Sequence, residues 1–202
     1  MGMPERKSAE ARREQIIATA LDLAHEVGPD RMTTEAIARR IGLTQAAVFR
    51  HFPRKSDIWV AVVDWLRRRL AGQWADTLAL GLAPTDTLRA LAIGQFLFIE
   101  TAPALPAILM SRELQADGGV LGQAIGGVMD AFRHTLAALV REGQRQGDVR
   151  PNLDSDQTAF ALIALIQGTA LRWVMQGRSF DLVAEGKAVI TIVIDGVRAR
   201  PG

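Results

Sequence analysis

The chain has 202 residues, of which 49% are hydrophobic and 23% charged, so it can bury a sizeable core and global disorder is excluded. It contains no cysteine, which excludes disulfides and thiolate chemistry and fits a reducing cytoplasm. The formal net charge is +2, but residues 1–70 carry +4 and the remainder −2, so positive charge gathers where a phosphate-binding surface would need it.

Apolar residues recur every three or four positions between Ala9 and Val27, which predicts one amphipathic helix. Gly28 and Pro29 should end it, because glycine suits a left-handed cap and proline cannot extend a helix. Two short helices are expected next, Thr34 to Ile41 and Gln45 to His51. The segment Gly42-Leu43-Thr44 separates them, and Thr33 or Thr34 serves as the N-cap of the first.

A proline-containing linker, Phe52 to Lys55, should precede a long fourth helix that runs to about Leu80. Ser56 is its expected N-cap, and Asp57 is favourable in its first turn. Beyond Leu82, breaks at proline and glycine delimit further helices near residues 85–101, 104–115, 119–146, 155–176 and 181–199. The alternation expected of strands is missing, so the predicted fold class is all-α.

Two short helices joined by a turn that contains glycine match the helix-turn-helix pattern, here TTEAIARRIGLTQAAVFRHF from Thr33 to Phe52. Ala38 is small enough for close helix approach, and Gly42 allows the turn. A small core is expected from Ile37, Ile41, Val48 and Phe52. The third helix is then expected to expose Gln45, Ala46, Ala47 and Arg50 to the DNA major groove. The alternative is a three-helix bundle with no role in DNA binding.

A long first helix, this motif, and Phe-Arg-His-Phe-Pro-Arg-Lys leading into a fourth helix resemble the TetR family of transcriptional regulators over residues 10–65. The resemblance implies a three-helix helix-turn-helix DNA-binding domain, residues 1–55, and a larger helical domain, residues 56–202, for ligand binding and dimerisation. It also implies a homodimer in the cytoplasm that binds a double-stranded palindromic operator and an unknown small-molecule effector.

The resemblance implies DNA contacts at ten positions. Thr34 and Glu35 correspond to positions that touch phosphate and reach toward a base, whereas Gln45, Ala46 and Ala47 occupy base-reading positions. Glutamine can pair with adenine, and alanine methyls can contact thymine methyls. Lys55 matches a phosphate anchor. The remaining positions are Thr44, Phe49, Arg50 and His51. Phe49 and Arg50 stand where the family commonly has tyrosine and another aromatic residue, so Phe49 is expected to pack and Arg50 to contact phosphate or guanine.

Two glutamines lie on apolar stripes, Gln95 with Leu88 and Phe96, and Gln167 with Phe160 and Ile163. Buried amides need partners, which could be a small molecule in an apolar cavity, backbone groups, or each other across a dimer interface. We therefore treat a set of residues as candidate ligand contacts, several of which could equally be plain core: Trp65, Gln95, Phe96, Met110, Met129, Phe132 and Gln167.

The last two predicted helices carry more apolar residues than one small domain can cover, which predicts a four-helix bundle across a two-fold axis. The residues expected in this dimer interface are Phe160, Ile163, Gln167, Leu171, Val174, Ile190, Val193 and Val197.

No catalytic arrangement is found, so an enzyme is not expected, and neither a cofactor nor a metal site is implied. The N-terminal stretch is polar and charged, and the apolar stretches are interrupted before they reach membrane-span length, so no membrane partner is expected. The predicted function is a repressor that a small apolar ligand releases from its operator. The alternatives are an activator or architectural DNA-binding protein, a small-molecule-binding module without DNA function, and an all-helical enzyme.

Overall fold

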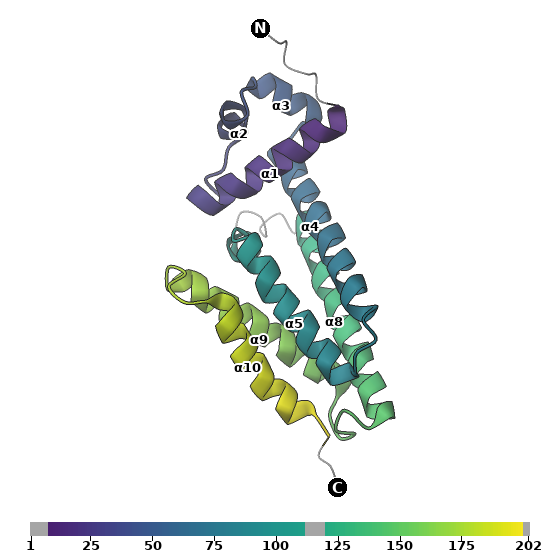
Figure 1. Cartoon of the computed structure of the whole chain (residues 1–202). Helices are drawn as coiled ribbons and strands as arrows, with labels where there is room; N and C mark the ends of the chain where they lie inside the picture. The colour runs from purple at the N-terminus through teal and green to yellow at the C-terminus, as the bar shows by residue number, and fades with distance from the viewer. Residues whose placement is uncertain (1–7, 112–119, 200–202) are drawn as a thin grey trace. The chain divides into compact units, whose positions relative to one another are not determined.

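The computed structural model describes residues 8–111 and 120–199, and every regular element within them is an α-helix. Its one β-type pairing among these residues is an isolated bridge between Val149 and Arg198. The all-α fold class is thus confirmed (Figure 1). The helices are α1 (Ala9–Val27), α2 (Thr34–Arg40), α3 (Gln45–His51), α4 (Lys55–Leu78), α5 (Pro84–Thr101), α6 (Leu105–Met110), α8 (Val120–Gln146), α9 (Ser155–Met175) and α10 (Leu182–Val197).

The described chain divides into two compact units. Unit 1 comprises residues up to 66 together with 107–125, and unit 2 comprises 67–106 and the residues from 126 onward. Because the division falls inside α4 and α8, each of these helices contributes residues to both units. The domain boundary expected between residues 55 and 56 stays a prediction.

Unit 1 contains a small apolar core to which α1, α2 and α3 all contribute, since each of these helices contacts the other two. Ile37 and Val48 are fully buried and Phe52 is 1% exposed, as expected for the core of a helix-turn-helix. Ile41 is only half-buried, because it stands at the C-terminal end of α2 rather than within the helix.

Helices α1, α2 and α3 each begin at an N-cap residue with a side-chain hydroxyl. The side chains of Ser8, Thr33 and Thr44 accept hydrogen bonds at 3.1–3.2 Å from backbone N–H groups three residues later. Thr33, and not Thr34, is therefore the cap of α2. Gly28 ends α1 with a φ of +88°, a left-handed value that favours glycine.

The prediction of Ser56 as the N-cap of α4 is wrong, because α4 begins at Lys55. The Asp57 carboxylate accepts a hydrogen bond at 3.0 Å from the backbone N–H of Arg54, and so closes the first turn from inside the helix. The expectation that Asp57 lies in this turn is confirmed, and its charge favours the positive end of the helix.

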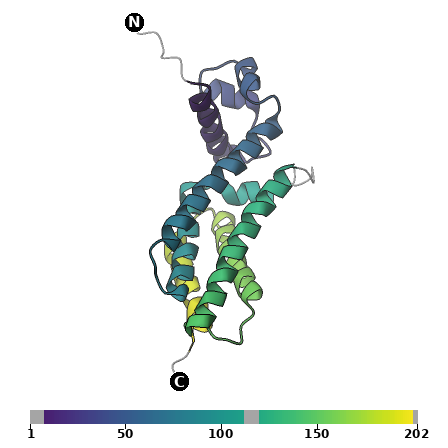
Figure 2. The same ribbon diagram turned by 90° about the vertical axis from the view of Figure 1, so that its right-hand side faces the viewer.

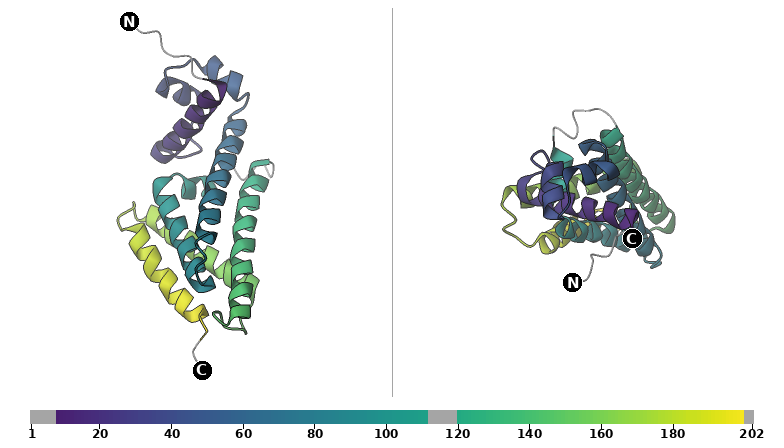
Figure 3. Two further views of the ribbon diagram at one scale, coloured as in Figure 1. Left: turned by 45° about the vertical axis from the view of Figure 1, so that its right-hand side comes forward. Right: turned by 90° about the horizontal axis from the view of Figure 1, so that it is seen from above.

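In unit 2, α10 lies antiparallel to α5 (Figures 1 and 3). Gly186 of α10 meets the ring of Phe96 so closely that an added Cβ would lie 2.4 Å from a ring carbon. At one end of this pair, the Arg198 guanidinium donates to the Asp86 carboxylate at 2.9 Å. The absence of a side chain at Gly186 allows the close approach of α10 to the Phe96 ring of α5.

The turn after α8 caps the first turn of α5. The Asp148 carboxylate accepts from the Thr85 backbone N–H at 2.7 Å and from the Thr85 hydroxyl at 3.0 Å. The same turn pairs with the end of α10, and Figure 2 shows both at one end of unit 2. Three segments distant in sequence are thus held together at this end.

The helices predicted in the second half of the chain begin and end within two residues of the observed ones, with one exception. The helix expected over 104–115 is observed as α6, Leu105–Met110, and residues 112–115 lie outside the described residues.

Candidate functional site

Helix α3 turns one face outward. Gln45, Ala46 and Arg50 are exposed, as expected, and Phe49 is 40% exposed. The expectation that Ala47 is also exposed is wrong, because Ala47 and Val48 form the buried face of α3. The outward surface therefore offers one amide, one guanidinium, one methyl and one aromatic ring.

Two of the predicted contact residues are joined to each other. The Gln45 side-chain amide donates to the hydroxyl oxygen of Thr34 at 2.9 Å, from the first turn of α3 to the first turn of α2. Thr34 is 7% exposed, whereas Gln45 is exposed. The hydroxyl of Thr34 thus lies beneath an exposed side chain.

Arg13 holds the other end of α3. Its guanidinium donates to the His51 carbonyl oxygen at 2.6 Å and lies 4.2 Å from the centre of the Phe52 ring. The positive charge of Arg13 is favourable at the C-terminal, negative end of the α3 dipole, and its guanidinium stacks on an aromatic face. Our sequence reasoning missed this residue. The signal for it was an arginine on α1, the helix expected to cover Phe52.

Two further predicted DNA contacts have partners within unit 1. Glu35 forms an exposed ion pair with Arg39 at 3.1 Å, one turn along α2. Lys55 donates to the Asp30 carbonyl oxygen at 3.3 Å, in the connection between α1 and α2. The Lys55 ammonium therefore has a structural contact in the protein without DNA.

Helices α1 and α2 are also linked at the surface by Glu26 and Arg40. The Arg40 guanidinium donates to both carboxylate oxygens of Glu26, at 2.9 and 2.6 Å. These hydrogen bonds lower the pKa of Glu26 below its ordinary value, and they raise the pKa of Arg40. The pair is solvent-exposed and stays ionised at neutral pH.

In unit 2, Gln95 is 8% exposed, so its predicted burial is confirmed. Its Nε2 finds no acceptor among the residues that the structure describes, and neither does the buried Nε1 of Trp74. The Trp74 ring stacks on Phe132, with ring centres 4.8 Å apart. Among the described residues, unit 2 therefore contains a buried amide donor and a buried indole donor without an acceptor, besides the buried Nε atoms of Arg89, Arg150 and Arg198.

The other candidate ligand contacts are scattered. Gln167 is exposed in the single chain, with its Nε2 3.4 Å from the sulfur of Met129, and its expected burial in a ligand site or a dimer interface stays a prediction. Phe96 is fully buried against α10. Trp65 is half-buried and belongs to unit 1, and the side chain of Met110 lies outside the described residues.

The faces of α9 and α10 that point away from unit 2 are apolar. Phe160 is 63% exposed, and Met175 and Ile192, which the sequence reasoning missed, are 78% and 73% exposed. Among the other predicted interface residues, Gln167 is exposed and Ile163, Leu171, Val174 and Val193 are half-buried. Ile190 and Val197 instead point into the core of unit 2, at 0% and 6% exposure, and do not belong to this face.

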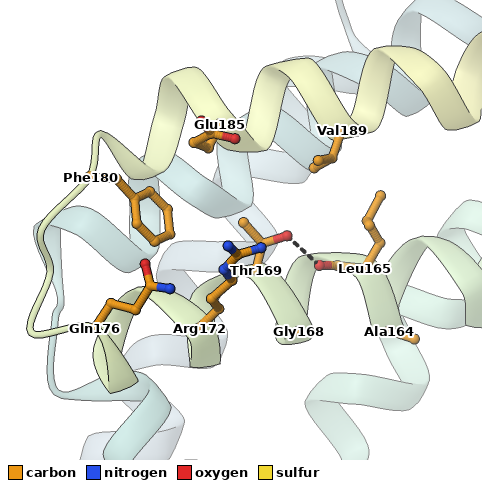
Figure 4. Close-up of a pocket in the computed structure, with 9 residues that line it drawn as sticks. All are labelled: Ala164, Leu165, Gly168, Thr169, Arg172, Gln176, Phe180, Glu185 and Val189. Carbon is orange, nitrogen blue, oxygen red and sulfur yellow. Dashed lines mark hydrogen bonds between the residues drawn. The ribbon is translucent and has the colours of Figure 1, made fainter.

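A groove of about 500 Å³ runs between α9 and α10 on this side (Figure 4). Small residues, Ala164 and Gly168, line it on α9, while Val189 and Glu185 line it from α10. Arg172, Gln176 and Phe180 surround one end. The groove is therefore largely apolar with a few charged groups.

Helix α9 is by length and composition apolar enough to span a membrane, the one such helix among the described residues. Only 28% of its apolar window is buried within the chain. A helix of this kind also occurs in soluble proteins, so it is weak evidence for a membrane. The low buried share shows that most of this apolar window of α9 is uncovered in a single chain.

Two family models match the sequence. Residues 16–62 match the model described as bacterial regulatory proteins, tetR family. Residues 106–182 match the model described as tetracyclin repressor-like, C-terminal domain. The first match covers α2, α3 and most of α1, and thus the whole helix-turn-helix.

Similar proteins are found over most of the chain. The fatty acid metabolism regulator protein of Bacillus subtilis is 23% identical over 189 residues, which cover 92% of this chain and 95% of the relative. The nucleoid occlusion factor SlmA of Klebsiella pneumoniae is 28% identical over 174 residues, 85% of this chain and 88% of the relative.

Two solved structures show the same fold. The transcriptional regulator FadR from Bacillus subtilis, in complex with stearoyl-CoA, has a TM-score of 0.79 at 21% identity and covers 91% of this chain and 98% of its own. A putative transcriptional regulator from Saccharomonospora viridis, in complex with choline, has a TM-score of 0.82 at 23% identity, with 95% and 100% covered. With the two family models and the outward face of α3, these likenesses show that the chain belongs to the TetR family and is a DNA-binding transcriptional regulator, not an enzyme.

Proposed function

We propose that this regulator is a cytoplasmic repressor that binds a palindromic operator as a homodimer and is released by a small apolar ligand. The outward face of α3 carries the proposal. Two side chains on this face, Gln45 and Arg50, can hydrogen-bond to base edges or phosphates.

The exposed apolar face of α9 and α10 supports the dimer. Phe160, Met175 and Ile192 are large side chains that water surrounds in a single chain. The groove beside them, with its small residues Ala164 and Gly168, can receive such a side chain from a second copy. In a two-fold dimer, each protomer places an exposed apolar side chain in the groove of its partner, so the contact forms twice.

A dimer has two recognition helices, so it should bind inverted repeats whose centres lie about one helical turn, or a multiple of it, apart. We would select duplexes from a randomised pool and measure affinity by fluorescence anisotropy at several salt concentrations. Affinity should fall steeply with salt, because each phosphate contact releases counterions. Selection of single half-sites, or binding that salt does not change, would contradict the dimeric operator complex.

Two substitutions separate base reading from phosphate binding. Gln45→Ala should relax base preference, since a bidentate base contact contributes roughly 1–3 kcal/mol of discrimination. Lys55→Ala should weaken binding to all sequences about equally, because phosphates carry no direct sequence information. A change of specificity in Lys55→Ala with none in Gln45→Ala would show that a different surface reads the bases.

Two of the buried donors of unit 2, Trp74 Nε1 and Gln95 Nε2, support a ligand with at least one hydrogen-bond acceptor. A buried N–H without a partner costs about 1–3 kcal/mol, and an acceptor would recover that free energy. The solved relatives have stearoyl-CoA and choline bound, so ligands of this fold vary widely. We therefore propose the general class, an apolar molecule with an acceptor, and no compound.

Release requires that ligand and operator favour different conformations. Helix α4 is continuous from Lys55 to Leu78 and contributes residues to both units, which offers a covalent route between them. A ligand that quenches Trp74 emission should lower operator affinity, and operator DNA should lower ligand affinity by the same factor. Equal ligand affinity with and without operator would leave ligand binding intact and remove the release mechanism.

Repression itself is tested by transcription in vitro from a promoter that overlaps the selected site. We expect the protein to lower the transcript yield and the ligand to restore it. A higher yield with the protein present would identify an activator of the same fold.

A further inference from the structure

We propose that Thr34 is a positioning residue for base recognition: its hydroxyl fixes the Gln45 side chain in the conformation that reads adenine. This inference rests on the proposed base-reading role of Gln45. A 2.9 Å hydrogen bond from Gln45 Nε2 to Thr34 Oγ1 links the two helices of the helix-turn-helix.

Burial distinguishes the two partners. Thr34 is 7% exposed and lies in the first turn of α2, directly after the N-cap Thr33. The Gln45 side chain is exposed at the start of α3. A buried hydroxyl therefore holds an exposed side chain, and the surface available for DNA is that of the glutamine.

The hydrogen bond leaves the correct atoms free. A glutamine amide has two N–H donors and a carbonyl oxygen, and Thr34 accepts only one of the donors. One donor and the carbonyl oxygen remain, which is the set that pairs with adenine N7 and N6 in the major groove. The contact with Thr34 thus orients Gln45 without using up its recognition groups.

Orientation matters because glutamine is flexible. An unrestrained glutamine side chain loses rotamer freedom when it becomes fixed, and this loss of entropy opposes binding. Part of that cost is met in the free protein if Thr34 already restricts the side chain, so less is lost on binding. The backbone supports this arrangement at both ends, since Thr33 and Thr44 cap α2 and α3 through their own hydroxyls.

The test compares Thr34→Val, which keeps the shape of the side chain and removes the acceptor, with Thr34→Ser, which keeps the hydroxyl. Duplexes selected in vitro by the wild-type protein serve as probes, with all four base pairs placed in turn at the position that Gln45→Ala relaxes. We expect Thr34→Val to reduce discrimination at that position about three- to tenfold, as for a lost hydrogen bond, and Thr34→Ser to retain it. Thr135→Val on α8, whose hydroxyl donates within its own helix, is the matched control and should change nothing.

Two further measurements separate positioning from other roles. In a double-mutant cycle, Thr34→Val should have almost no additional effect on discrimination once Gln45 is alanine. In the protein without DNA, Thr34→Val should shift the side-chain amide NMR signals of Gln45 and leave the helical circular dichroism unchanged.

Three results would overturn the proposal. If Thr34→Val weakens all duplexes equally and reduces the salt dependence, Thr34 binds phosphate instead. If its effect on discrimination persists in the Gln45→Ala background, Thr34 acts independently of Gln45. If Gln45→Ala changes no base preference while salt-dependent operator binding remains, there is no reading residue to position, and the proposed role of Gln45 fails separately from DNA binding itself.

Discussion

The helices of unit 1 and the last two helices of unit 2 differ in how completely they bury their apolar residues. In unit 1 the large core residues Ile37, Val48 and Phe52 are 0–1% exposed, and the outward face of α3 carries the polar groups of Gln45 and Arg50 beside Ala46 and Phe49. On α9 and α10, Phe160, Met175 and Ile192 are 63–78% exposed. The core residues of unit 1 are thus buried within the chain, whereas unit 2 leaves large apolar side chains exposed in the single chain.

An amphipathic pattern alone does not distinguish a core face from an interface. Both are apolar stripes at helical spacing. The structure separates them by exposure, because Ile190 and Ile192 lie two positions apart on α10 yet are 0% and 73% exposed.

The largest effect is expected from Ile192→Glu. A charge on the exposed apolar face should prevent dimerisation and lower operator affinity by about 10²- to 10⁴-fold, because the second half-site no longer adds to binding. Light scattering gives the oligomeric state, and anisotropy gives the affinity. Leu80→Glu is the control, since Leu80 is 65% exposed in the connection between α4 and α5. A dimeric Ile192→Glu protein would place the interface elsewhere.

The second prediction compares the loss of stability on replacing a buried and an exposed phenylalanine. Phe52→Ala should destabilise unit 1 by about 3–5 kcal/mol, because it leaves a cavity and removes the ring beneath Arg13. Phe160→Ala should change stability by less than about 0.5 kcal/mol when measured in the monomeric Ile192→Glu background, since Phe160 is then a surface residue. Urea denaturation provides both values. A large loss at Phe160 in the monomer would mean that this face packs within the chain.

The third effect concerns the opposite side of α10. Gly186→Ala should destabilise unit 2 by about 1–3 kcal/mol, because the new methyl would overlap the Phe96 ring. Gly127→Ala on α8 is the matched control, since a Cβ at Gly127 meets nothing within 4 Å. Thermal unfolding of the two variants should differ clearly. An unchanged midpoint for Gly186→Ala would show that α5 and α10 separate without cost.

The smallest effect is expected from Glu26→Gln, because the ion pair with Arg40 is exposed and solvent screens it. The lowered pKa of Glu26 means that its stabilisation is present above the unfolded value, 4.5, and is lost as pH falls through the lowered folded value. The variant should melt slightly below wild type at pH 7 and together with it at strongly acidic pH. A difference that persists in acid would have a cause other than this charge.

The sequence predicted most of the fold because the signals were local. Gly28, Thr33 and Thr44 each mark a helix boundary by a requirement of the residue itself, and the structure places boundaries there. The start of α4 was misplaced because Ser56 was expected to cap it, whereas the helix begins at Lys55 and Asp57 accepts from the Arg54 backbone N–H within the first turn.

The site was predicted less completely because contacts between distant residues leave no local trace. The outward position of Gln45 followed from helical spacing, but its bond to Thr34 depends on how α2 and α3 meet. The same holds for Arg13 and His51, which are 38 positions apart. Gln167 lies on a part of its apolar stripe that is exposed in the single chain, and the sequence does not say whether such a stripe faces a core, a ligand or a second chain.

The contact between Gly186 and Phe96 limits how this sequence can change over time. A larger residue at 186 is acceptable only after position 96 has become smaller, and a smaller residue at 96 leaves a cavity until 186 has grown. Each single step lowers stability, although both together can restore it. The two positions are therefore expected to be exchanged as a pair between related proteins, and Phe96→Leu should rescue part of the loss caused by Gly186→Ala.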